Sequence, residues 1–201
     1  VTYRTTTPID IPNVLDRVYT YLDAVTPAVL EDKTTGSPIT DFSNLPDSAV
    51  FKTGDFRLIS YEWGVTYAGM LNASEATGNK KYADYVSDRL GFLSALYPFC
   101  QQRFISNKSA HNPMRSVVSP HALDDAGAMC AAMVKANLRG LGGETRPMIN
   151  NFMSYISNVE YRLPDGTLAR NRPLVNSLWL DDLFMSVPAL AQMGKLTGDV
   201  K

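Results

Sequence analysis

The stretch LWLDDLFMSVPALAQM, residues 178–193, decides the fold, because the acidic pair Asp181-Asp182 opens a long run of small and apolar residues. The same order of residue types occurs in SPHALDDAGAMCAAMV, where Asp124-Asp125 opens the run. Carboxylates in the first turn of a helix face the positive end of the helix dipole, so simple capping would explain each pair. The alternative is that both helix starts converge on one pocket, where two carboxyl groups could do acid–base chemistry on a sugar.

A third helix start belongs with these two, since Glu62-Trp63 opens the apolar part of ISYEWGVTYAGMLNASEATGNKKY. The starts at Trp63, Asp124 and Asp181 lie roughly 60 residues apart, which is long enough for one helical hairpin and its connections. A repeated unit of this length predicts that the three starts lie along one rim of the fold.

Turn residues repeat together with the helix starts. Residues 77–79 (TGN) end the first apolar helix, residues 197–199 (TGD) end the last one, and residues 140–143 (GLGG) serve the middle unit. Glycine suits the left-handed residue that ends a helix, and Asn or Asp can cap the helix that follows. The chain is therefore expected to repeat a unit of helix, tight turn and returning helix.

Hydrophobic periodicity and these turns predict six helices joined by irregular segments. In the first helix, Val14, Val18, Tyr21, Leu22 and Val25 share one face. The helices are expected at about residues 13–25, 62–76, 79–97, 124–138, 145–161 and 180–196, with an extended arm at 1–12 and irregular connections at 26–57, 100–120 and 162–178.

The predicted helices alternate in character. Those that start near residues 62, 124 and 180 are rich in Gly, Ala, Met and Ser and carry few charges after the first turn, whereas the others carry more. Helices that are apolar all round are buried, and amphipathic helices face water. The alternation predicts an all-α toroid of helical hairpins, with an inner and an outer ring, in one domain over residues 1–201. Little sheet is expected, because no segment shows a convincing alternating strand pattern.

Three inner helices cannot close a ring, because each helical unit exposes an apolar face that only the next unit covers. The helix at 180–196 has no returning partner in the sequence, so its outer side is expected to lack a cover. We therefore expect about half of a barrel, an open half-ring that would not be catalytically competent by itself.

The composition argues against several classes of protein. The formal net charge is −1 and no basic block occurs, which gives no electrostatic support for a nucleic-acid partner. No apolar run approaches the length of a membrane span. Cys100 and Cys130 lack metal-ligand spacing and are interpreted as packing residues, so neither a metal nor a cofactor is expected. The oligomeric state stays open.

Three segments carry a resemblance to a known family: YEWGVTYAGMLNASEATGNKKY, LDDAGAM and DGTLARNRPLVNSLWLDDLFMSVPALAQMGKLTGD. Over about residues 60–200 the sequence resembles the unsaturated rhamnogalacturonyl hydrolases, glycoside hydrolase family 105, and more distantly the unsaturated glucuronyl hydrolases of family 88. The resemblance implies an (α/α)6 barrel. It also implies an oligosaccharide substrate with a 4,5-unsaturated uronic acid at its non-reducing end, cleaved through hydration of the double bond.

The resemblance also implies roles for individual residues. Asp181 would be the principal acid–base residue, which protonates C4 and then activates water for C5. Either Asp124 or Asp125 would be its partner acid, and Asp124 is favoured. Trp63 would stack on the sugar ring, although a tryptophan buried in the core is the alternative.

Further candidates for substrate binding lie near the same helix starts. Glu62 opens the first of these helices, and His121 lies three residues before Asp124. Asp125 joins them if it is not the partner acid. Arg170 could hold the substrate carboxylate because its fork can bind both oxygens, although a salt bridge is the more common role of such an arginine.

Two other functions remain open. A non-catalytic carbohydrate-binding toroid would use the paired aspartates only to bind sugar hydroxyls, but the motif LWLDDLFM favours an enzyme. A toroid lyase or epimerase would show a general-base His or Tyr, and His121 keeps that alternative open. The sequence does not identify the sugar or its linkage.

Overall fold

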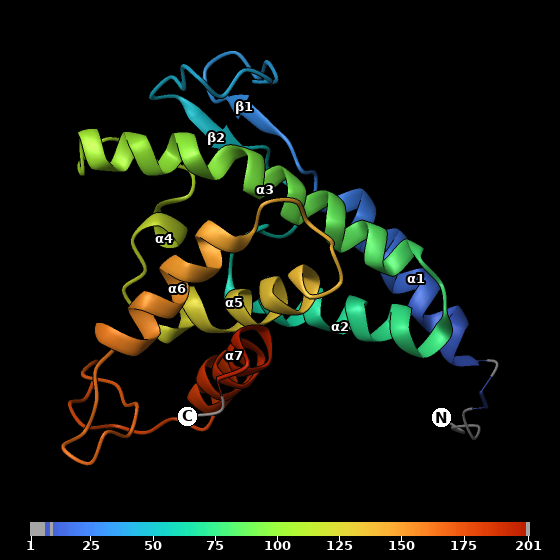
Figure 1. Cartoon of the computed structure of the whole chain (residues 1–201). Coiled ribbons are helices and arrows are strands. Elements are labelled where there is room, and N and C mark those ends of the chain that lie inside the picture. The colour runs from blue at the N-terminus through green and yellow to red at the C-terminus, as the bar shows by residue number, and fades with distance from the viewer. Residues whose placement is uncertain (1–6, 9, 200–201) are drawn as a thin grey trace.

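The computed structural model describes residues 7–8 and 10–199, and this part of the chain folds mainly into helices. The helices are α1 (Asp10–Val25), α2 (Tyr61–Thr77), α3 (Lys81–Ser106), α4 (Arg115–Val118), α5 (Leu123–Asn137), α6 (Arg146–Asn158) and α7 (Asp181–Thr197). Two short strands, β1 (Leu30–Asp32) and β2 (Ala49–Phe51), pair as one antiparallel hairpin. The predicted all-α fold is confirmed, and within the described residues the sheet is confined to this hairpin (Figure 1).

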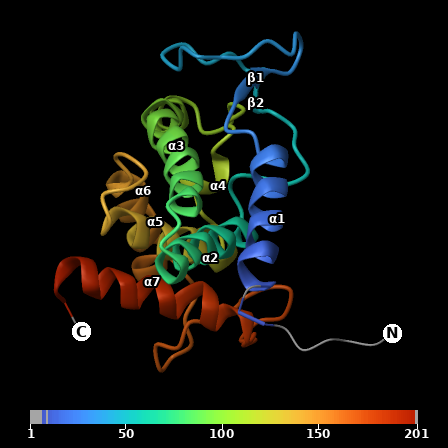
Figure 2. The ribbon, with the colours of Figure 1, turned by 90° about the vertical axis from the view of Figure 1, so that its right-hand side faces the viewer.

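Two helical hairpins and α7 build two layers. The helix α5 lies between α2 and α7, and these three form one layer (Figures 1 and 2). The helix α3 packs against α2, and α6 packs against α5, as the returning helices of the two hairpins. Eleven of the 15 residues of α5 are buried, so this helix is the centre of the core. The arrangement agrees with the predicted alternation of inner and returning helices.

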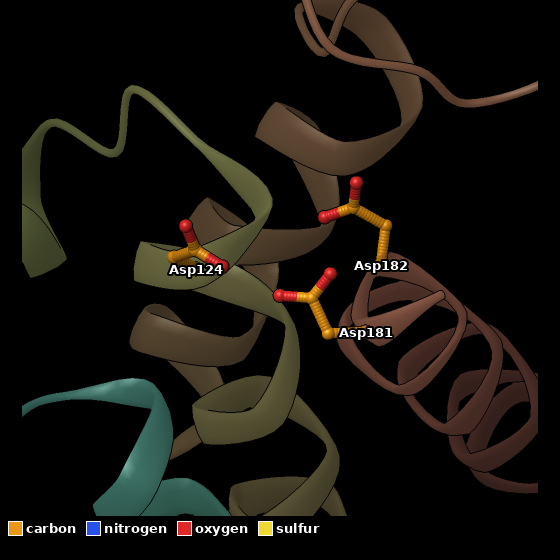
Figure 3. A group of neighbouring side chains, drawn as sticks. All are labelled: Asp124, Asp181 and Asp182. Carbon is orange, nitrogen blue, oxygen red and sulfur yellow. The ribbon is translucent and has the colours of Figure 1, made fainter. Parts of the chain in front are cut away.

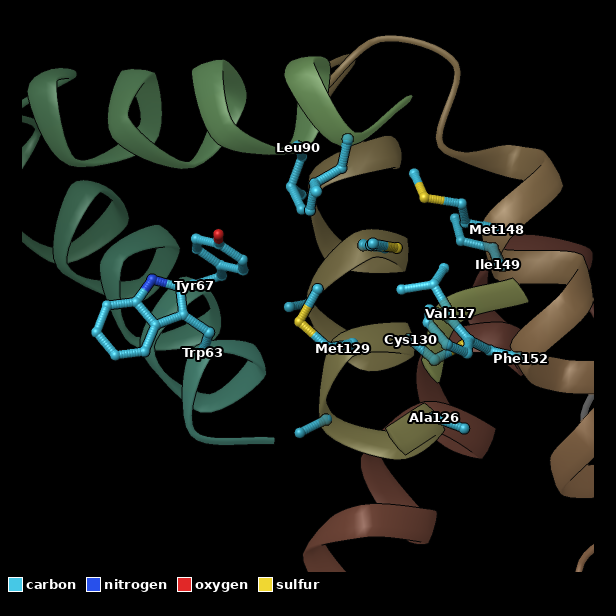
Figure 4. Packing of buried hydrophobic residues seen from close by; sticks show 14 of the residues in the cluster. Trp63, Tyr67, Leu90, Val117, Ala126, Met129, Cys130, Met148, Ile149 and Phe152 are labelled. Atoms are coloured by element: carbon cyan, nitrogen blue, oxygen red, sulfur yellow. The ribbon is translucent and has the colours of Figure 1, made fainter. Parts of the chain in front are cut away.

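The core joins side chains from all the helices around α5. Figure 4 shows Tyr67 of α2, Leu90 of α3, Val117 of α4, Met129 of α5 and Phe152 of α6, all of which are fully buried. Each hairpin alone would leave such side chains in water, so the hairpins are stable only when they pack together.

The predicted glycine turns end two of the helices. Gly78 and Gly198 adopt left-handed backbone with φ of 71° and 76°, and each donates its N–H to the carbonyl four residues earlier at 2.9 Å. At the start of α2, the Ser60 hydroxyl accepts the backbone N–H of Trp63 at 3.3 Å. These helix ends therefore follow from local sequence.

Two glycines set the distance between the helices of the inner layer. A Cβ on Gly64 of α2 would lie 2.4 Å from the backbone carbonyl carbon of Ala128 in α5. A Cβ on Gly127 of α5 would lie 1.6 Å from the carbonyl oxygen of Met185 in α7. The backbones of these helices are thus in direct contact near their starts, which explains why the inner helices need small residues.

The helix α1 differs from its prediction in extent and in orientation. It already includes residues 10–12, so the extended arm is wrong there, and the rest of that arm lies mostly outside the described residues. On the predicted packing face, Leu22 packs against the core, but Val14 and Val18 are 46% and 44% exposed. Leu15 and Tyr19, outside that face, pack against the core as well. The helix is apolar on two sides, and periodicity alone could not decide which side finds a partner.

The helix α3 is longer than predicted. It continues through Pro98 to Ser106, although the prediction ended it before the proline. Tertiary contacts hold the extension, because Cys100 is buried and Arg103 donates to the Leu45 carbonyl at 2.7 Å. The last turns of α3 and the four-residue α4 thus occupy a stretch that was predicted as irregular.

One face of α7 is apolar and exposed to solvent. Leu183, Phe184, Val187 and Leu190 are between 41% and 57% exposed. This agrees with the expectation that the outer side of the last inner helix lacks a cover, while the half-ring itself stays a prediction. Neither α7 nor any other described helix is both long and apolar enough to cross a membrane.

The close contact at Gly127 predicts that one added methyl group at this position destabilises the fold. We expect Gly127→Ala to lower the free energy of unfolding by about 3 kcal/mol, because the new Cβ would collide with the Met185 backbone and force α5 and α7 apart. Urea denaturation followed by circular dichroism measures the change. The matched control is Gly69→Ala in α2, where no atom lies within 4 Å of the added Cβ. This control should raise stability by about 0.5–1 kcal/mol, and equal stability of both variants would contradict the packing account.

Candidate active site at the helix starts

Three carboxylates from two helices meet where α5 and α7 begin. Asp124 lies in the first turn of α5, and Asp181 and Asp182 lie in the first turn of α7. Each offers a carboxylate oxygen within 4.8 Å of the others, and Figure 3 shows the side chains facing one another. Because Gly127 brings the two helices into contact one turn further on, their starts must lie side by side.

Arg170 joins the three carboxylates. Its Nε and Nη2 donate to the two oxygens of Asp182 at 2.8 and 2.7 Å. The same Nη2 lies 3.2 Å from Asp124 Oδ1 and 3.4 Å from Asp181 Oδ2. The hydrogen bonds with Asp182 raise the pKa of the Arg170 guanidinium further, so it remains charged.

Two further contacts hold Arg170 in place. The guanidinium lies over the Trp179 ring, 4.3 Å from its centroid, as a cation–π contact. The backbone of Arg170 pairs with Ser177 through hydrogen bonds of 2.9 and 3.2 Å. The segment before α7, which was predicted as irregular, therefore forms a small loop that presents one arginine to the helix starts.

The three aspartates differ in their access to solvent. The Asp182 side chain is 8% exposed and binds Arg170 through both oxygens, whereas the Asp181 side chain is 52% exposed and makes the longest contact. Asp124 is intermediate, with 35% of its side chain exposed. A ligand can therefore reach Asp181 and Asp124, and Asp182 serves to anchor the arginine.

Sequence reasoning missed the role of Asp182, although a signal for it exists. The buried residues of α7 are Asp182, Met185, Ser186 and Ala189, which follow the spacing of one helix face. An acid on the buried face of a helix needs a cation as partner. That requirement could have singled out Asp182 and suggested Arg170.

Asp125 has a different partner from its neighbour. Its Oδ2 accepts the backbone N–H of His121 at 3.0 Å and lies 2.5 Å from Nδ1 of the same residue. The His121 ring is 70% exposed, and the Arg172 guanidinium donates to its backbone carbonyl at 3.1 Å. Asp125 thus fixes the turn that precedes α5 and orients an accessible imidazole.

Trp63 is placed differently from the predicted sugar platform. Its ring is only 4% exposed, its indole N–H donates to the Tyr85 hydroxyl at 3.2 Å, and Phe56 covers it at a centroid distance of 4.8 Å. The interpretation as an open stacking face is therefore wrong in this structure, and the core alternative fits. The reason is that Phe56, from the preceding segment, stacks on one face of the Trp63 ring.

Sequence reasoning also missed Tyr61, whose pKa is affected by the charges of the neighbouring carboxylates. Its pKa is raised above its usual range, first by the charge of Glu62 and its hydrogen bond, then by burial and by the charges of Asp124 and Asp181. The phenol therefore keeps its proton and remains a hydrogen-bond donor. Glu62 and Tyr61 are both exposed at the start of α2, and the charges of Asp124 and Asp181 act on Tyr61, so all three predicted helix starts contribute to one region.

Two cavities adjoin this region. The smaller, of about 290 Å³, is lined by Asp124, Asp182, Arg170 and Arg172 together with Glu160 and the 121–123 turn. The larger, of about 990 Å³, is lined by residues 51–60, the start of α2 and residues 113–121. His121 lines both cavities.

The carboxylate cluster also has the spacing of metal ligands. Among the residues that the structure describes, Asp124, Asp181 and Asp182 form the one group of that kind. Arg170 donates to all three of them, so its guanidinium already occupies the position that a cation would take. The donor set therefore fits an ion-paired cluster better than a metal centre.

Breaking the ion pair of Asp182 should destabilise the fold. We expect Arg170→Met to lower the free energy of unfolding by about 3 kcal/mol, because Asp182 would remain buried without a counter-charge. The control Arg162→Met removes an arginine whose bonds are to backbone carbonyls, at 2.8 and 3.1 Å, and should cost about 1 kcal/mol. Adding Asp182→Asn to Arg170→Met should restore part of the loss in urea denaturation, and no restoration would argue against the charge as its cause.

The sequence model of Glycosyl Hydrolase Family 88 matches residues 23–201, a range that includes all four residues of the cluster. No individual curated protein matches the chain. The match confirms the predicted resemblance at the level of family 88, and the finer assignment to family 105 stays a prediction.

Proposed function

Because the chain belongs to glycosyl hydrolase family 88, we propose that it cleaves oligosaccharides that carry a 4,5-unsaturated uronic acid at the non-reducing end. Such oligosaccharides are the products of polysaccharide lyases. The observation that carries the proposal is the convergence of Asp124 and Asp181, from two helix starts, on one accessible site. Of the possible substrates we propose fragments of rhamnogalacturonan, because the motif LWLDDLFMSVP resembles the rhamnogalacturonyl hydrolases.

Asp181 is the acid–base residue in this proposal. It protonates C4 of the double bond, and its carboxylate then accepts a proton from the water that adds to C5. The resulting hemiketal opens to a ketone at C5, and the hemiacetal left at C1 releases the rest of the chain as an alcohol. Asp181 suits this role because its side chain is half exposed and its contact with Arg170 is the weakest in the cluster.

The neighbouring groups hold the substrate and the acid in position. Asp124 lies close enough to Asp181 to hydrogen-bond the same ring. Arg170 is occupied by three aspartates, so its role is to position them rather than to bind the substrate carboxylate. The exposed His121 and Arg172 line the smaller cavity and are better placed for that carboxylate.

A second candidate function is a lyase or epimerase that uses the same cavity. The observation in its favour is the pair of His121 and Asp125, in which a carboxylate orients an exposed imidazole. Such a pair can act as a general base. A non-catalytic sugar-binding protein would need neither this pair nor an accessible Asp181.

Ultraviolet absorbance separates hydration of an unsaturated uronide from the other functions in one assay. Hydration removes the double bond of an unsaturated uronide, so the proposed activity predicts loss of its ultraviolet band on mixing with the full-length protein. A lyase would create such a double bond from a saturated polysaccharide and raise the absorbance. A binding protein or an epimerase would leave the absorbance unchanged, and an unchanged band with unsaturated rhamnogalacturonan and glucuronan fragments would refute the proposal.

Asp181→Asn should abolish turnover without unfolding the protein. We expect the rate to fall by at least about 100-fold, because the variant lacks the proton donor. Stability should change by less than about 1 kcal/mol, since Asn keeps the size of Asp and the weakened ion pair with Arg170 is half exposed. The control is Asp165→Asn in the exposed turn before α7, which should keep the wild-type rate. A rate above about one tenth of wild type would exclude the acid–base role of Asp181.

The two acids at the start of α5 should respond differently. We expect Asp124→Asn to lose most activity, because Asp124 shares the cluster with Asp181. Asp125→Asn should have a smaller effect, since Asp125 contacts His121 instead. Steady-state rates of the two variants on one unsaturated disaccharide test this, and loss of activity in Asp125→Asn alone would shift the assignment by one residue.

A further inference from the structure

The larger of the two cavities has no role in the chemistry above. Its volume of about 990 Å³ lies at the upper end of ligand pockets in proteins, whereas the smaller cavity, of about 290 Å³, lies at the lower end. Residues 51–60 form one wall, and residues 113–121 around α4 form another. Because His121 lines both cavities, a ligand longer than one sugar ring could extend from the first into the second.

Phe56 presents an aromatic surface in this larger cavity. Its ring stacks on Trp63 with centroids 4.8 Å apart and ring planes at 29°, and Tyr21 packs against it edge-on at 6.3 Å. Trp63 is fixed in turn by its hydrogen bond to Tyr85. Phe56 is nevertheless 43% exposed. A supported and half-exposed aromatic ring suits the apolar C–H face of a sugar.

Polar side chains surround this aromatic surface. Ser60, Ser116 and Ser119 line the cavity with hydroxyl groups, and Lys52 and Arg57 add positively charged donors. Ligand sites typically combine an apolar surface with a few polar groups that fix orientation. Here the combination matches a ring that is apolar on one face and carries hydroxyls around its edge.

We propose that this cavity is the subsite for the leaving sugar and that Phe56 is its stacking platform. The inference rests on the proposed function, because it places the unsaturated ring against Asp181 and Asp124. Of these two acids Asp124 lines the smaller cavity, so the sugar bonded to C1 can extend from there into the larger cavity, which shares His121 with it. Phe56 thereby favours substrates that carry a sugar, rather than a small alcohol, in the leaving position.

The test compares two substrates in turnover assays of the full-length protein. One is unsaturated galacturonic acid linked to rhamnose, and the other is the methyl glycoside of the same uronic acid. In the wild type, kcat/KM should be higher for the disaccharide, and in Phe56→Ala the ratio of the two values should fall about tenfold, the effect of one lost stacking contact. Phe56→Tyr should restore the ratio, because it keeps the ring.

The matched control is Phe99→Ala, which truncates a phenylalanine that is 39% exposed on α3 and lines a different pocket. Its ratio should equal that of the wild type. If Phe56→Ala lowers kcat/KM for both substrates by the same factor, Phe56 only supports the fold and the subsite is overturned.

Direct binding separates failure of the subsite from failure of the proposed reaction. Methyl rhamnoside, titrated by calorimetry, should bind the wild type several-fold more tightly than Phe56→Ala. If this difference in affinity is found but no uronide loses its ultraviolet band, the sugar subsite is supported and the hydration reaction is refuted. Equal affinity of both proteins, or no binding to either, overturns the subsite whatever the turnover assay gives.

Discussion

The direct backbone contact of α5 with its two neighbours is the constraint on which the rest of the structure depends. Gly64 lets α2 approach α5, and Gly127 lets α5 approach α7, at distances that leave no room for a side chain. Both glycines lie within a turn or two of the helix starts. The contacts therefore fix the distance between the helices and also bring the starts of all three helices into one region. Gly64 and Gly127 therefore determine both the packing of the three helices and the formation of the site.

The convergence of the helix starts brings three carboxylates together. Within the described residues, the guanidinium of Arg170 offsets their negative charge. Three carboxylates share one guanidinium, so the cluster keeps an excess of negative charge. Arg170 binds the three acids unequally. Its Nε and Nη2 donate short hydrogen bonds to Asp182, whereas its hydrogen bond to Asp181 is the longest of the cluster. The buried acid thus provides stability, and its exposed neighbour keeps the access to solvent that acid–base chemistry needs.

The loops around the helix starts add what the helices cannot supply. The segment after β2 covers Trp63 with Phe56, and the segment before α7 delivers Arg170. In both cases a residue from an irregular segment is fixed by a tryptophan, since Arg170 lies over Trp179 as Phe56 lies over Trp63. Loops supported by a rigid scaffold commonly carry binding residues. The cavity on the Phe56 side and the cavity on the Arg170 side are accordingly built from different parts of the chain, with His121 between them.

The recurrence of an acidic helix start predicted the approach of Asp124 to Asp181, which the packing of α5 against α7 brings about. The sequence by itself determined the all-α fold, the hairpins and the glycine turns. These features depend on capping, turn geometry and helical periodicity, which act over a few residues and can be read from neighbouring positions. Only the tertiary structure decided which face of α1 packs, that α3 continues past Pro98, that Trp63 is covered, and that Asp182 rather than Asp181 takes the arginine. Each of these depends on a partner far away in the chain, as Arg170 is 46 residues from Asp124 and Trp63 is 22 residues from Tyr85. Local pattern shows that an apolar face or a buried acid needs a partner, but the choice among distant partners is made only when the helices pack.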